Sequence, residues 1–244
     1  MFRPYISLII PVYNEEERLQ NSLEKIIDYF DKQTYSYEIL IVDDGSKDKT
    51  IEIANKYLPK VVIYSYGENK GKGAAVKYGM LKAKGEICIF TDADLSTPIY
   101  EIDKMLNEFE NKKCDIVIGN RAAGYDMIKI HQPWYREFMG KTFNKFVQLF
   151  VFKGISDTQC GFKGFRYEAA QKIFNKTEIQ KFGFDVEILY LALKSNFDIR
   201  QIKVEWYNDA RSKVNPIKDS IQMFKDILRI KKLHKNTVFP LKLQ

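Results

Sequence analysis

The chain has 244 residues, of which 45% are hydrophobic and 29% are charged. This length and composition suit one large globular domain with a buried core, and they exclude a largely disordered chain. The formal net charge of +7 favours an anionic partner. Such a partner can be a phosphorylated substrate, an acidic lipid surface or nucleic acid.

Short aliphatic runs alternate with amphipathic stretches through the first half of the chain. The predicted strands are Tyr5–Val12, Glu38–Asp43, Val61–Ser65, Ile87–Thr91 and Asp115–Gly119. The predicted helices are Glu16–Phe30, Lys49–Tyr57, Gly73–Ala83 and Ile99–Asn111. Continuous aliphatic runs such as Ile39–Val42 are typical of parallel strands buried on both faces. The alternation predicts an α/β fold with a mostly parallel, doubly wound sheet.

The second half is less regular. Residues 122–154 mix aromatic with basic side chains, and several bulky residues there fall near helical spacing: Tyr135, Met139, Phe143, Phe146 and Phe150. Further helices are expected around 168–175 and 184–195, and an alternating strand at Ile199–Trp206. The tail after Pro216 predicts a basic amphipathic helix. We therefore expect one domain over residues 1–215 and a helical appendage over residues 216–244.

The cysteines and the apolar segments bear on the compartment. Cys88, Cys114 and Cys160 are widely spaced and form no CxxC pair, which favours a reducing compartment. No segment approaches the roughly 18 consecutive apolar residues that a membrane span requires. The start of the sequence also lacks the layout of a signal peptide. We expect a cytoplasmic protein that can lie on a membrane surface.

Polar residues follow four of the predicted strands at the points where the strands end. They are Asn14-Glu15, Asp43-Asp44-Gly45-Ser46, Asp92-Ala93-Asp94 and Gly119-Asn120-Arg121. In doubly wound sheets, ligands bind in the crevice beyond the carboxyl ends of the strands. The sequence therefore predicts a binding site at this edge of the sheet.

Asp92 and Asp94 are the sharpest feature of that edge. Two carboxylates one residue apart can share a hard cation such as Mg²⁺ or Mn²⁺, and the cation can hold a diphosphate and neutralise charge on a leaving group. A helix cap or a solvated turn is the alternative. The position directly after a predicted strand favours the metal site.

Two further loops suit a nucleotide. A carboxylate of Asp43 or Asp44 can accept hydrogen bonds from a base or a ribose hydroxyl. The alternative is an Asp-Gly turn capped by Ser46, and both can hold at once. The segment 69–73 lacks the spacing of a P-loop, but its glycines and lysines before a helix can form a phosphate-facing nest, with a surface turn as the alternative.

Four cations are candidates for a phosphate acceptor: Arg121, Arg136, Lys163 and Lys213. In a chain with 39 Lys and Arg residues, any one of them can instead be a solvated surface charge. The two histidines, His131 and His234, form no cluster in the sequence. A phosphate acceptor is already ionised near neutral pH, so its attack requires no strong general base.

The ordered blocks resemble the inverting glycosyltransferases of family 2, which have the nucleotide-sugar (GT-A) fold. Within that family the chain looks most like the dolichyl-phosphate β-glucosyltransferases and the polyprenyl-phosphate mannosyl- and glucosyltransferases. The matching blocks span about residues 5–215. They are Pro11–Glu15, Asp43–Thr50, Asn69–Ala74, Asp92–Ser96, Gly119–Arg121, Asp157–Lys163, Phe184–Glu187 and Ser212-Lys213.

The resemblance implies a role for each matching residue. The nucleoside and diphosphate would be surrounded by Pro11, Tyr13, Glu15, Asp43, Asp44 and Lys72. Asp92 and Asp94 would be the metal-side carboxylates, with Mg²⁺ or Mn²⁺ as cofactor. The acceptor phosphate would be held by Arg121 and Arg136, with Lys213 closing over the phosphates. Asp157 or Asp185 would face the donor sugar.

The chain also departs from the family pattern. A glutamine that helps to hold metal in mannosyl relatives is replaced by Ser96, and we expect no N-terminal membrane anchor of the kind that many glucosyl members carry. We therefore expect peripheral attachment to the cytoplasmic face of a membrane, through residues 127–153 and the basic helix after Pro216. The alternative is that those aromatic side chains are buried packing residues.

The expected activity is transfer of glucose from UDP-glucose to a dolichyl or polyprenyl phosphate with inversion at the anomeric carbon. Transfer of mannose from GDP-mannose, transfer of another hexose, and a family 2 transferase acting on a polysaccharide are alternatives. A nucleotidyltransferase would carry a glycine-rich loop after the first strand, where this chain has Val12-Tyr13-Asn14-Glu15. A catalytically dead docking module would have no need of Asp92 and Asp94. Nucleic acid is not an expected partner, because no recognised binding module appears.

Overall fold

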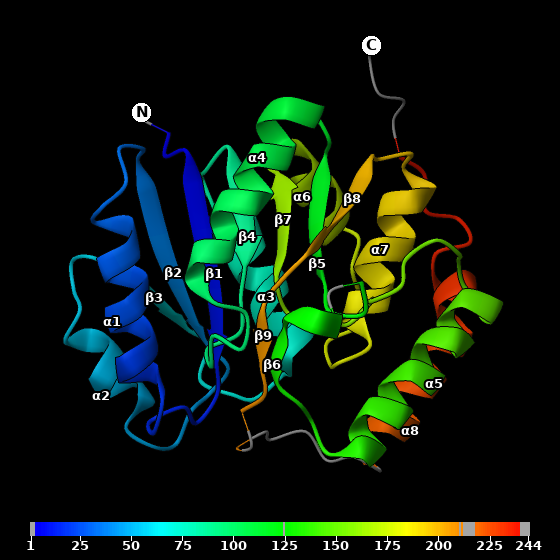
Figure 1. The fold of residues 1–244 in the computed structure, drawn as a ribbon, viewed down its shortest axis with the longest axis horizontal. Coiled ribbons are helices and arrows are strands. Elements are labelled where there is room, and N and C mark those ends of the chain that lie inside the picture. The colour runs from blue at the N-terminus through cyan, green and yellow to red at the C-terminus, as the bar shows by residue number, and fades with distance from the viewer. Residues whose placement is uncertain (1–2, 124, 210, 212–217, 240–244) are drawn as a thin grey trace.

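The computed structural model describes residues 3–123, 125–209, 211 and 218–239 (Figure 1). Its strands are β1 (Ile6–Val12), β2 (Tyr37–Asp43), β3 (Val62–Ser65), β4 (Ile87–Phe90), β5 (Ile116–Asn120), β6 (Ile128–Ile130), β7 (Lys163–Arg166), β8 (Ile199–Lys203) and β9 (Trp206–Tyr207). Its helices are α1 (Leu19–Phe30), α2 (Thr50–Asn55), α3 (Lys72–Lys82), α4 (Ile102–Lys112), α5 (Trp134–Phe150), α6 (Tyr167–Phe174), α7 (Phe184–Lys194) and α8 (Lys218–Leu233), with 3₁₀ turns at Ile99–Glu101 (η1) and Tyr125–Met127 (η2).

The main sheet has the strand order β3-β2-β1-β4-β7-β5-β8 among the described residues. Neighbouring strands are parallel except around β7, which runs antiparallel to both β4 and β5. The chain moves from β1 out to β3 and then returns to place β4 on the other side of β1. The carboxyl ends of β1 and β4 therefore flank a switch point, where ligands bind in this class of sheet. The predicted α/β fold with a mostly parallel sheet is confirmed.

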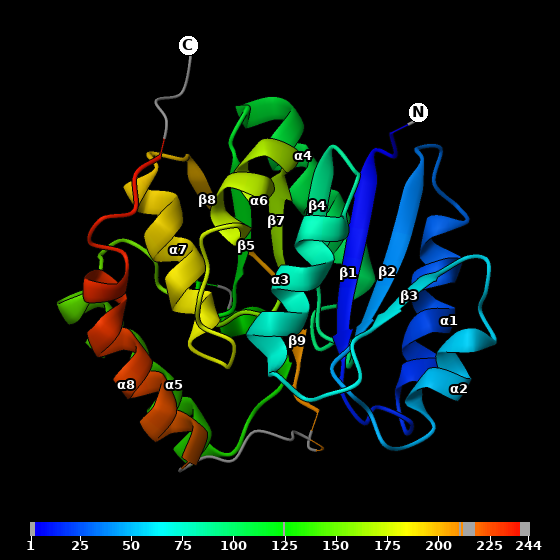
Figure 2. The ribbon, with the colours of Figure 1, turned by 180° about the vertical axis from the view of Figure 1, so that it is seen from behind.

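Two apolar clusters cover the two faces of the sheet. Along β1, Leu8 and Ile10 belong to one cluster and Ile9 to the other, because successive side chains of a strand point to opposite faces. Helices α1 and α4 lie over the first face, whereas α3, α6 and α7 lie over the second, as the front and back views show (Figures 1 and 2). The fully apolar strands follow from this burial on both sides.

Helices α5 and α8 lie side by side at the end of the molecule beyond α7 (Figures 1 and 2). The ring of Phe224 on α8 lies 5.5 Å from that of Phe143 and 5.0 Å from that of Phe146, both on α5. On α8, Ile227 and Ile230 are buried in the same cluster as the back face of the sheet. Residues 218–233, which the sequence analysis assigned to a helical appendage over residues 216–244, therefore pack against the domain.

None of the helices built from described residues is long and apolar enough to cross a membrane.

Candidate active site

A cavity of about 380 Å³ opens at the carboxyl edge of the sheet. Six of the residues predicted from the sequence line it: Lys72, Asp92, Asp94, Arg121, Arg136 and Asp185. They come from the start of α3, the loop after β4, the end of β5, the first turns of α5 and the start of α7. Residues spread over more than a hundred positions of the chain therefore meet in one place.

The loop after β4 presents both carboxylates to this cavity. Asp94 accepts a hydrogen bond from the backbone N–H of Ser96 at 2.9 Å, and Leu95 between them adopts a left-handed conformation with φ of 50°. Burial raises the pKa of Asp94, and the neighbouring charge of Asp92 raises it further. A bound cation would offset both effects, since an opposite charge favours the carboxylate form.

Asp92 meets a different partner. The Nζ atom of Lys72 lies 2.5 Å from Asp92 Oδ1 as an ion pair, although the pair is not aligned as a hydrogen bond. Within the described part of the chain, that buried oxygen has no hydrogen-bond partner. Burial lowers the pKa of Lys72, but the charges of Asp92 and Asp185 outweigh it and leave the pKa raised. Lys72 is thus a cation at the place where a diphosphate would meet Asp92.

These residues fit a divalent metal that is shared with a substrate. Among the described residues no group of three His, Cys, Asp or Glu side chains forms a metal cage. Mg²⁺ is usually bound by one or two carboxylates together with water and substrate phosphates, so a pair of carboxylates is sufficient. Asp92 and Asp94 supply that pair, and Asp92 Oδ1 has capacity for a further partner.

The loop before α3 is held by Asp44. This carboxylate accepts hydrogen bonds from the hydroxyl of Tyr66 at 2.7 Å and from the backbone N–H groups of Lys70 and Gly71, both at 2.8 Å. Gly71 has φ of 108°, a conformation that favours glycine, and it leads directly into α3. The carboxylate fixes the direction in which Lys72 leaves the loop.

Asp43 and Asp44 are both buried, and their contact with a nucleoside stays a prediction. Asp43 accepts hydrogen bonds from the backbone N–H of Ser46 at 2.9 Å and from the hydroxyl of Ser65 at 2.8 Å. Both side chains therefore organise loops at the edge of the site, in line with the alternative of a structural turn.

Arg121 is fixed by Asp157. The carboxylate accepts from Arg121 Nε at 2.7 Å, from Nη2 at 2.9 Å and from the Arg121 backbone N–H at 3.0 Å. Burial raises the pKa of Asp157, but the guanidinium of Arg121 outweighs it and holds the pKa below its usual range. Asp157 does not line the main cavity. It faces an adjoining cavity of about 460 Å³, which Arg121 and Arg136 share.

Lys163 requires a correction. Its side chain is fully buried, and its Nζ donates to Asp185 Oδ1 at 2.5 Å and to the carbonyl oxygen of Cys160 at 2.6 Å. It is therefore not placed to contact an acceptor phosphate, since β7 carries it into the interior of the sheet. Burial raises the pKa of Asp185, and the charges of Lys163 and Lys72 oppose that rise.

Two residues near the metal-side carboxylates were missed by the sequence analysis. Arg18 forms an ion pair with Glu15, and its Nη1 lies 3.6 Å from Asp94 Oδ2 and 3.5 Å from Asp209 Oδ2. Asp209 lines the main cavity. The spacing of Glu15 and Arg18 could have suggested their pairing, since residues three apart meet on a helical turn. Nothing local connects either of them with Asp209.

The remaining predicted residues lie at the margin of the site or outside the described chain. Pro11 is at the end of β1 and Tyr13 directly after it, both partly buried. Glu15 is buried and lines a separate cavity beside Arg18, whose lining residues are all polar or charged. Lys213 lies outside the described residues.

Comparison with known proteins identifies the family of this chain. The family model described as glycosyl transferase family 2 matches residues 7–174, which is more than half of the chain. The protein belongs to that family, and it is a glycosyltransferase.

Its relatives narrow the group. The chain is 39% identical to a dolichyl-phosphate β-glucosyltransferase of Dictyostelium discoideum, over 93% of this chain and 74% of that protein. It is 34% identical to the enzyme of that name from Homo sapiens and 32% identical to the one from Saccharomyces cerevisiae, with the same coverage. Within family 2 the chain therefore falls among the dolichyl-phosphate β-glucosyltransferases.

A solved structure shares the fold. Glucosyl-3-phosphoglycerate synthase from Mycobacterium tuberculosis in complex with UDP superposes with a TM-score of 0.69, over 99% of this chain and 89% of that one, at 16% sequence identity. Other crystal structures of that enzyme contain UDP together with Mg²⁺ or Mn²⁺. At this identity the likeness establishes the fold alone.

Proposed function

We propose that this enzyme transfers glucose from UDP-glucose to a dolichyl or similar polyprenyl phosphate, with inversion at the anomeric carbon and with Mg²⁺ or Mn²⁺ as cofactor. The observation that carries the proposal is the division of one cavity between two kinds of residue. Asp92, Asp94 and Lys72 lie at the ends of β4 and α3, and Arg121 and Arg136 lie at β5 and α5. A donor diphosphate fits the first group and an acceptor phosphate fits the second.

The chemistry divides between the same groups. Asp92 and Asp94 would hold a divalent cation, which would supply positive charge to stabilise the departing nucleoside diphosphate. Lys72 adds a positive charge next to Asp92. Arg121 and Arg136 orient the acceptor phosphate, whose ionised oxygen attacks the anomeric carbon as the bond to the diphosphate breaks. Asp157 holds the Arg121 guanidinium by two parallel hydrogen bonds, which fixes its plane for a second anion.

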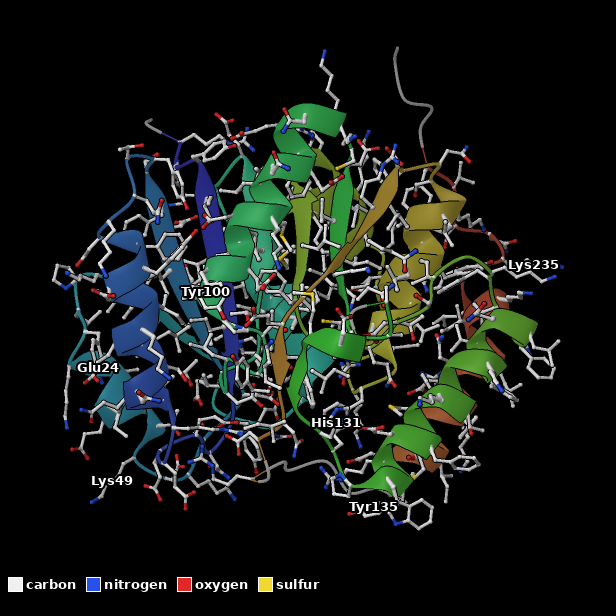
Figure 3. The ribbon with its side chains drawn as sticks, viewed as in Figure 1. Glu24, Lys49, Tyr100, His131, Tyr135 and Lys235 are labelled. Carbon is white, nitrogen blue, oxygen red and sulfur yellow. The ribbon has the colours of Figure 1, made fainter. Side chains whose placement is uncertain are left out.

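The position of α5 supports a lipid acceptor and a peripheral location at the cytoplasmic face of a membrane. Phe138 lines the cavity and is 65% exposed, and Trp134, one turn earlier, is 80% exposed. The neighbouring Tyr135 points outward at the tip of the helix (Figure 3). Aromatic side chains of this kind favour the boundary between water and lipid, where the phosphate of a polyprenyl phosphate also resides.

A transfer assay tests the proposal. Purified protein is incubated with Mg²⁺ or Mn²⁺, a short polyprenyl phosphate and a panel of UDP- and GDP-sugars. We expect lipid-linked glucose from UDP-glucose, and a loss of about 100-fold or more in Asp94→Asn, because that variant removes charge stabilisation at the leaving group. Asp28→Asn is the matched control, since Asp28 forms an exposed ion pair on α1 away from the cavity.

Other outcomes of the same assay would contradict parts of the proposal. Formation of lipid-linked mannose from GDP-mannose would show that the proposed donor is wrong and the proposed acceptor is right. Hydrolysis of the donor, or transfer to sugars or peptides alone, would overturn the lipid acceptor. Equal rates for Asp94→Asn and Asp28→Asn would overturn the metal site.

A further inference from the structure

A buried acid–base pair lies behind the site. Glu187 on α7 and His234, directly after α8, are both fully buried, and His234 Nε2 lies 2.7 Å from Glu187 Oε1. Because the carboxylate oxygen accepts, Nε2 carries a proton, and Nδ1 lies within hydrogen-bond distance of the hydroxyl of Thr237 at 3.1 Å. Neither Glu187 nor His234 lines either of the cavities that hold the candidate site.

Glu187 also accepts hydrogen bonds from the backbone of a loop. Oε1 also accepts from the backbone N–H of Glu178 at 2.9 Å, and Oε2 accepts from that of Ile179 at 3.0 Å. Both amides belong to residues 175–183, the loop that connects α6 to α7. Three donors therefore converge on one buried carboxylate, two from this loop and one from the end of the C-terminal helix.

The same loop lies against the start of α3. The backbone N–H of Ala74 donates to the carbonyl oxygen of Gln180 at 3.0 Å, and Lys77 Nζ donates to the carbonyl oxygen of Thr177 at 2.6 Å. The fit is close, because a Cβ atom at Gly71 would lie 2.7 Å from Gln180 O and one at Gly73 would lie 2.7 Å from Ile179 O. A shift of the loop would therefore displace these glycines.

Lys72 lies between these two glycines and forms the ion pair with Asp92. The contacts thus run without a gap from His234 to Glu187, from Glu187 to the amides of residues 178 and 179, and from the loop to Gly71–Ala74. If this acid–base pair served packing alone, its two carboxylate oxygens would not both have to accept hydrogen bonds from the loop 175–183, which contacts the site. Apolar side chains of similar volume often replace such pairs without loss of stability.

We propose that Glu187 and His234 are positioning residues of the donor site, which fix the loop 175–183 against the start of α3 and so hold Lys72 beside Asp92. The proposal rests on the proposed function in one respect, namely that Lys72 contacts the donor diphosphate. Neither residue touches the substrate. Their effect appears in donor affinity and leaves the chemical step nearly unchanged.

Three variants and a control separate this role from packing. Glu187→Gln is nearly isosteric, but its amide NH₂ cannot accept from a backbone N–H. His234→Ala removes the donor to Glu187, whereas His234→Gln supplies a side-chain N–H in its place. Lys194→Met is the control, because the Nζ hydrogen bonds of Lys194 tie the carbonyl oxygens of His234 and Lys235 to α7 and leave the Glu187–His234 side-chain pair intact.

The first measurement is the Kd for UDP with Mg²⁺ by calorimetry, together with KM and kcat for the donor. We expect Glu187→Gln and His234→Ala to raise both Kd and KM about tenfold with kcat within about twofold. His234→Gln is expected to recover most of the affinity, and Lys194→Met to match the wild type. If Glu187→Gln and His234→Ala bind UDP with the same Kd as the wild type, the positioning role is overturned. An equal loss of UDP affinity in Lys194→Met would also overturn it.

The second measurement needs no nucleotide. Amide hydrogen exchange of the unliganded variants is expected to accelerate about tenfold or more at residues 71–75 and 177–180 in Glu187→Gln and His234→Ala, with wild-type rates in Lys194→Met. Faster exchange confined to α8 would overturn the proposal. Failure of the wild type to bind UDP would instead contradict the proposed function, and the exchange data would still decide whether the pair holds the loop.

Discussion

At the scale of single residues, the positions of the motifs along the sequence predicted which side chains gather at the site. They did not predict the hydrogen-bond and ion-pair partners of each side chain. Asp92, Asp94 and Lys72 meet as expected, because each follows a strand or begins a helix at the same edge of the sheet. Lys163 differs because its strand, β7, lies inside the sheet, which turns a predicted phosphate ligand into the buried partner of Asp185. His234 looked isolated in the sequence because its partner, Glu187, lies 47 positions away.

The pair of Arg121 and Asp157 gives a prediction at this scale. In Asp157→Asn the guanidinium loses its counter-ion and part of its hydrogen bonding while it remains largely buried. Breaking a buried pair by removing one partner costs about 3 kcal/mol in the free energy of unfolding. Urea denaturation at pH 7 measures this loss, with Asp28→Asn as the control that is expected to match the wild type.

The same pair predicts a dependence on pH. The pKa of Asp157 is lowered in the folded state, so its stabilisation is fully present above the unfolded value of about 3.9 and is lost as the pH falls through the folded value. The difference in stability between wild type and Asp157→Asn is therefore expected to be constant from pH 7 to about pH 5 and to shrink below about pH 4. A difference that grew on acidification would show that this carboxylate is not the ionised partner of Arg121.

At the scale of elements, the sequence located the aliphatic strands and missed β6 and β7, which contain charged side chains. β1, β2, β4 and β5 were found because burial on both faces leaves continuous aliphatic runs. β7 was missed because its four residues include Lys163, Gly164 and Arg166, which do not resemble a central strand. Gly164 lies under Met105 and Phe109 of α4, where a Cβ atom would collide, so tertiary packing decided this residue and local propensity did not.

Helix α5 was predicted from its aromatic spacing, but the pattern left open which side chains are buried. The structure divides them, with Phe143 buried against α8 and Trp134 and Phe138 exposed. If the exposed face contacts lipid, the double variant Trp134→Ser and Phe138→Ser is expected to bind vesicles less tightly. At about 1.5 kcal/mol for each apolar side chain, the loss is roughly tenfold per residue.

Co-sedimentation with vesicles that contain an acidic lipid measures this loss. Val62→Ser is the control, because Val62 is also exposed but lies on β3, at the opposite edge of the sheet from α5. Equal binding by the double variant and the control would contradict a membrane contact through α5. Because Phe138 also lines the cavity, the transfer rate to a water-soluble short-chain acceptor is measured for Trp134→Ser alone, and an intact rate confirms that this variant keeps its active site.

At the scale of the whole molecule, the fold class followed from the alternation of elements, whereas the extent of the core did not. Pro216 and the basic amphipathic helix predicted after it suggested a boundary between a domain and an appendage. In the structure, Met223, Ile227 and Ile230 belong to the cluster that covers the back of the sheet. An amphipathic helix presents the same sequence pattern whether its apolar face meets lipid or a protein core, so the pattern alone cannot assign it.

Shortening the chain to residues 1–215 tests which description holds. Burial of each of Met223, Ile227 and Ile230 contributes about 1.5–3 kcal/mol to the free energy of unfolding. Their total is comparable with the whole free energy of unfolding of a typical domain. Shortening the chain also uncovers Phe143 and leaves Glu187 without its histidine. We therefore expect the shortened chain to lack a cooperative urea transition and a native near-ultraviolet circular dichroism spectrum, whereas a chain that ends after Phe239 unfolds like the full sequence. A cooperative transition in the 1–215 chain would show that the core closes without α8, and the division at residue 215 would then describe two separable units.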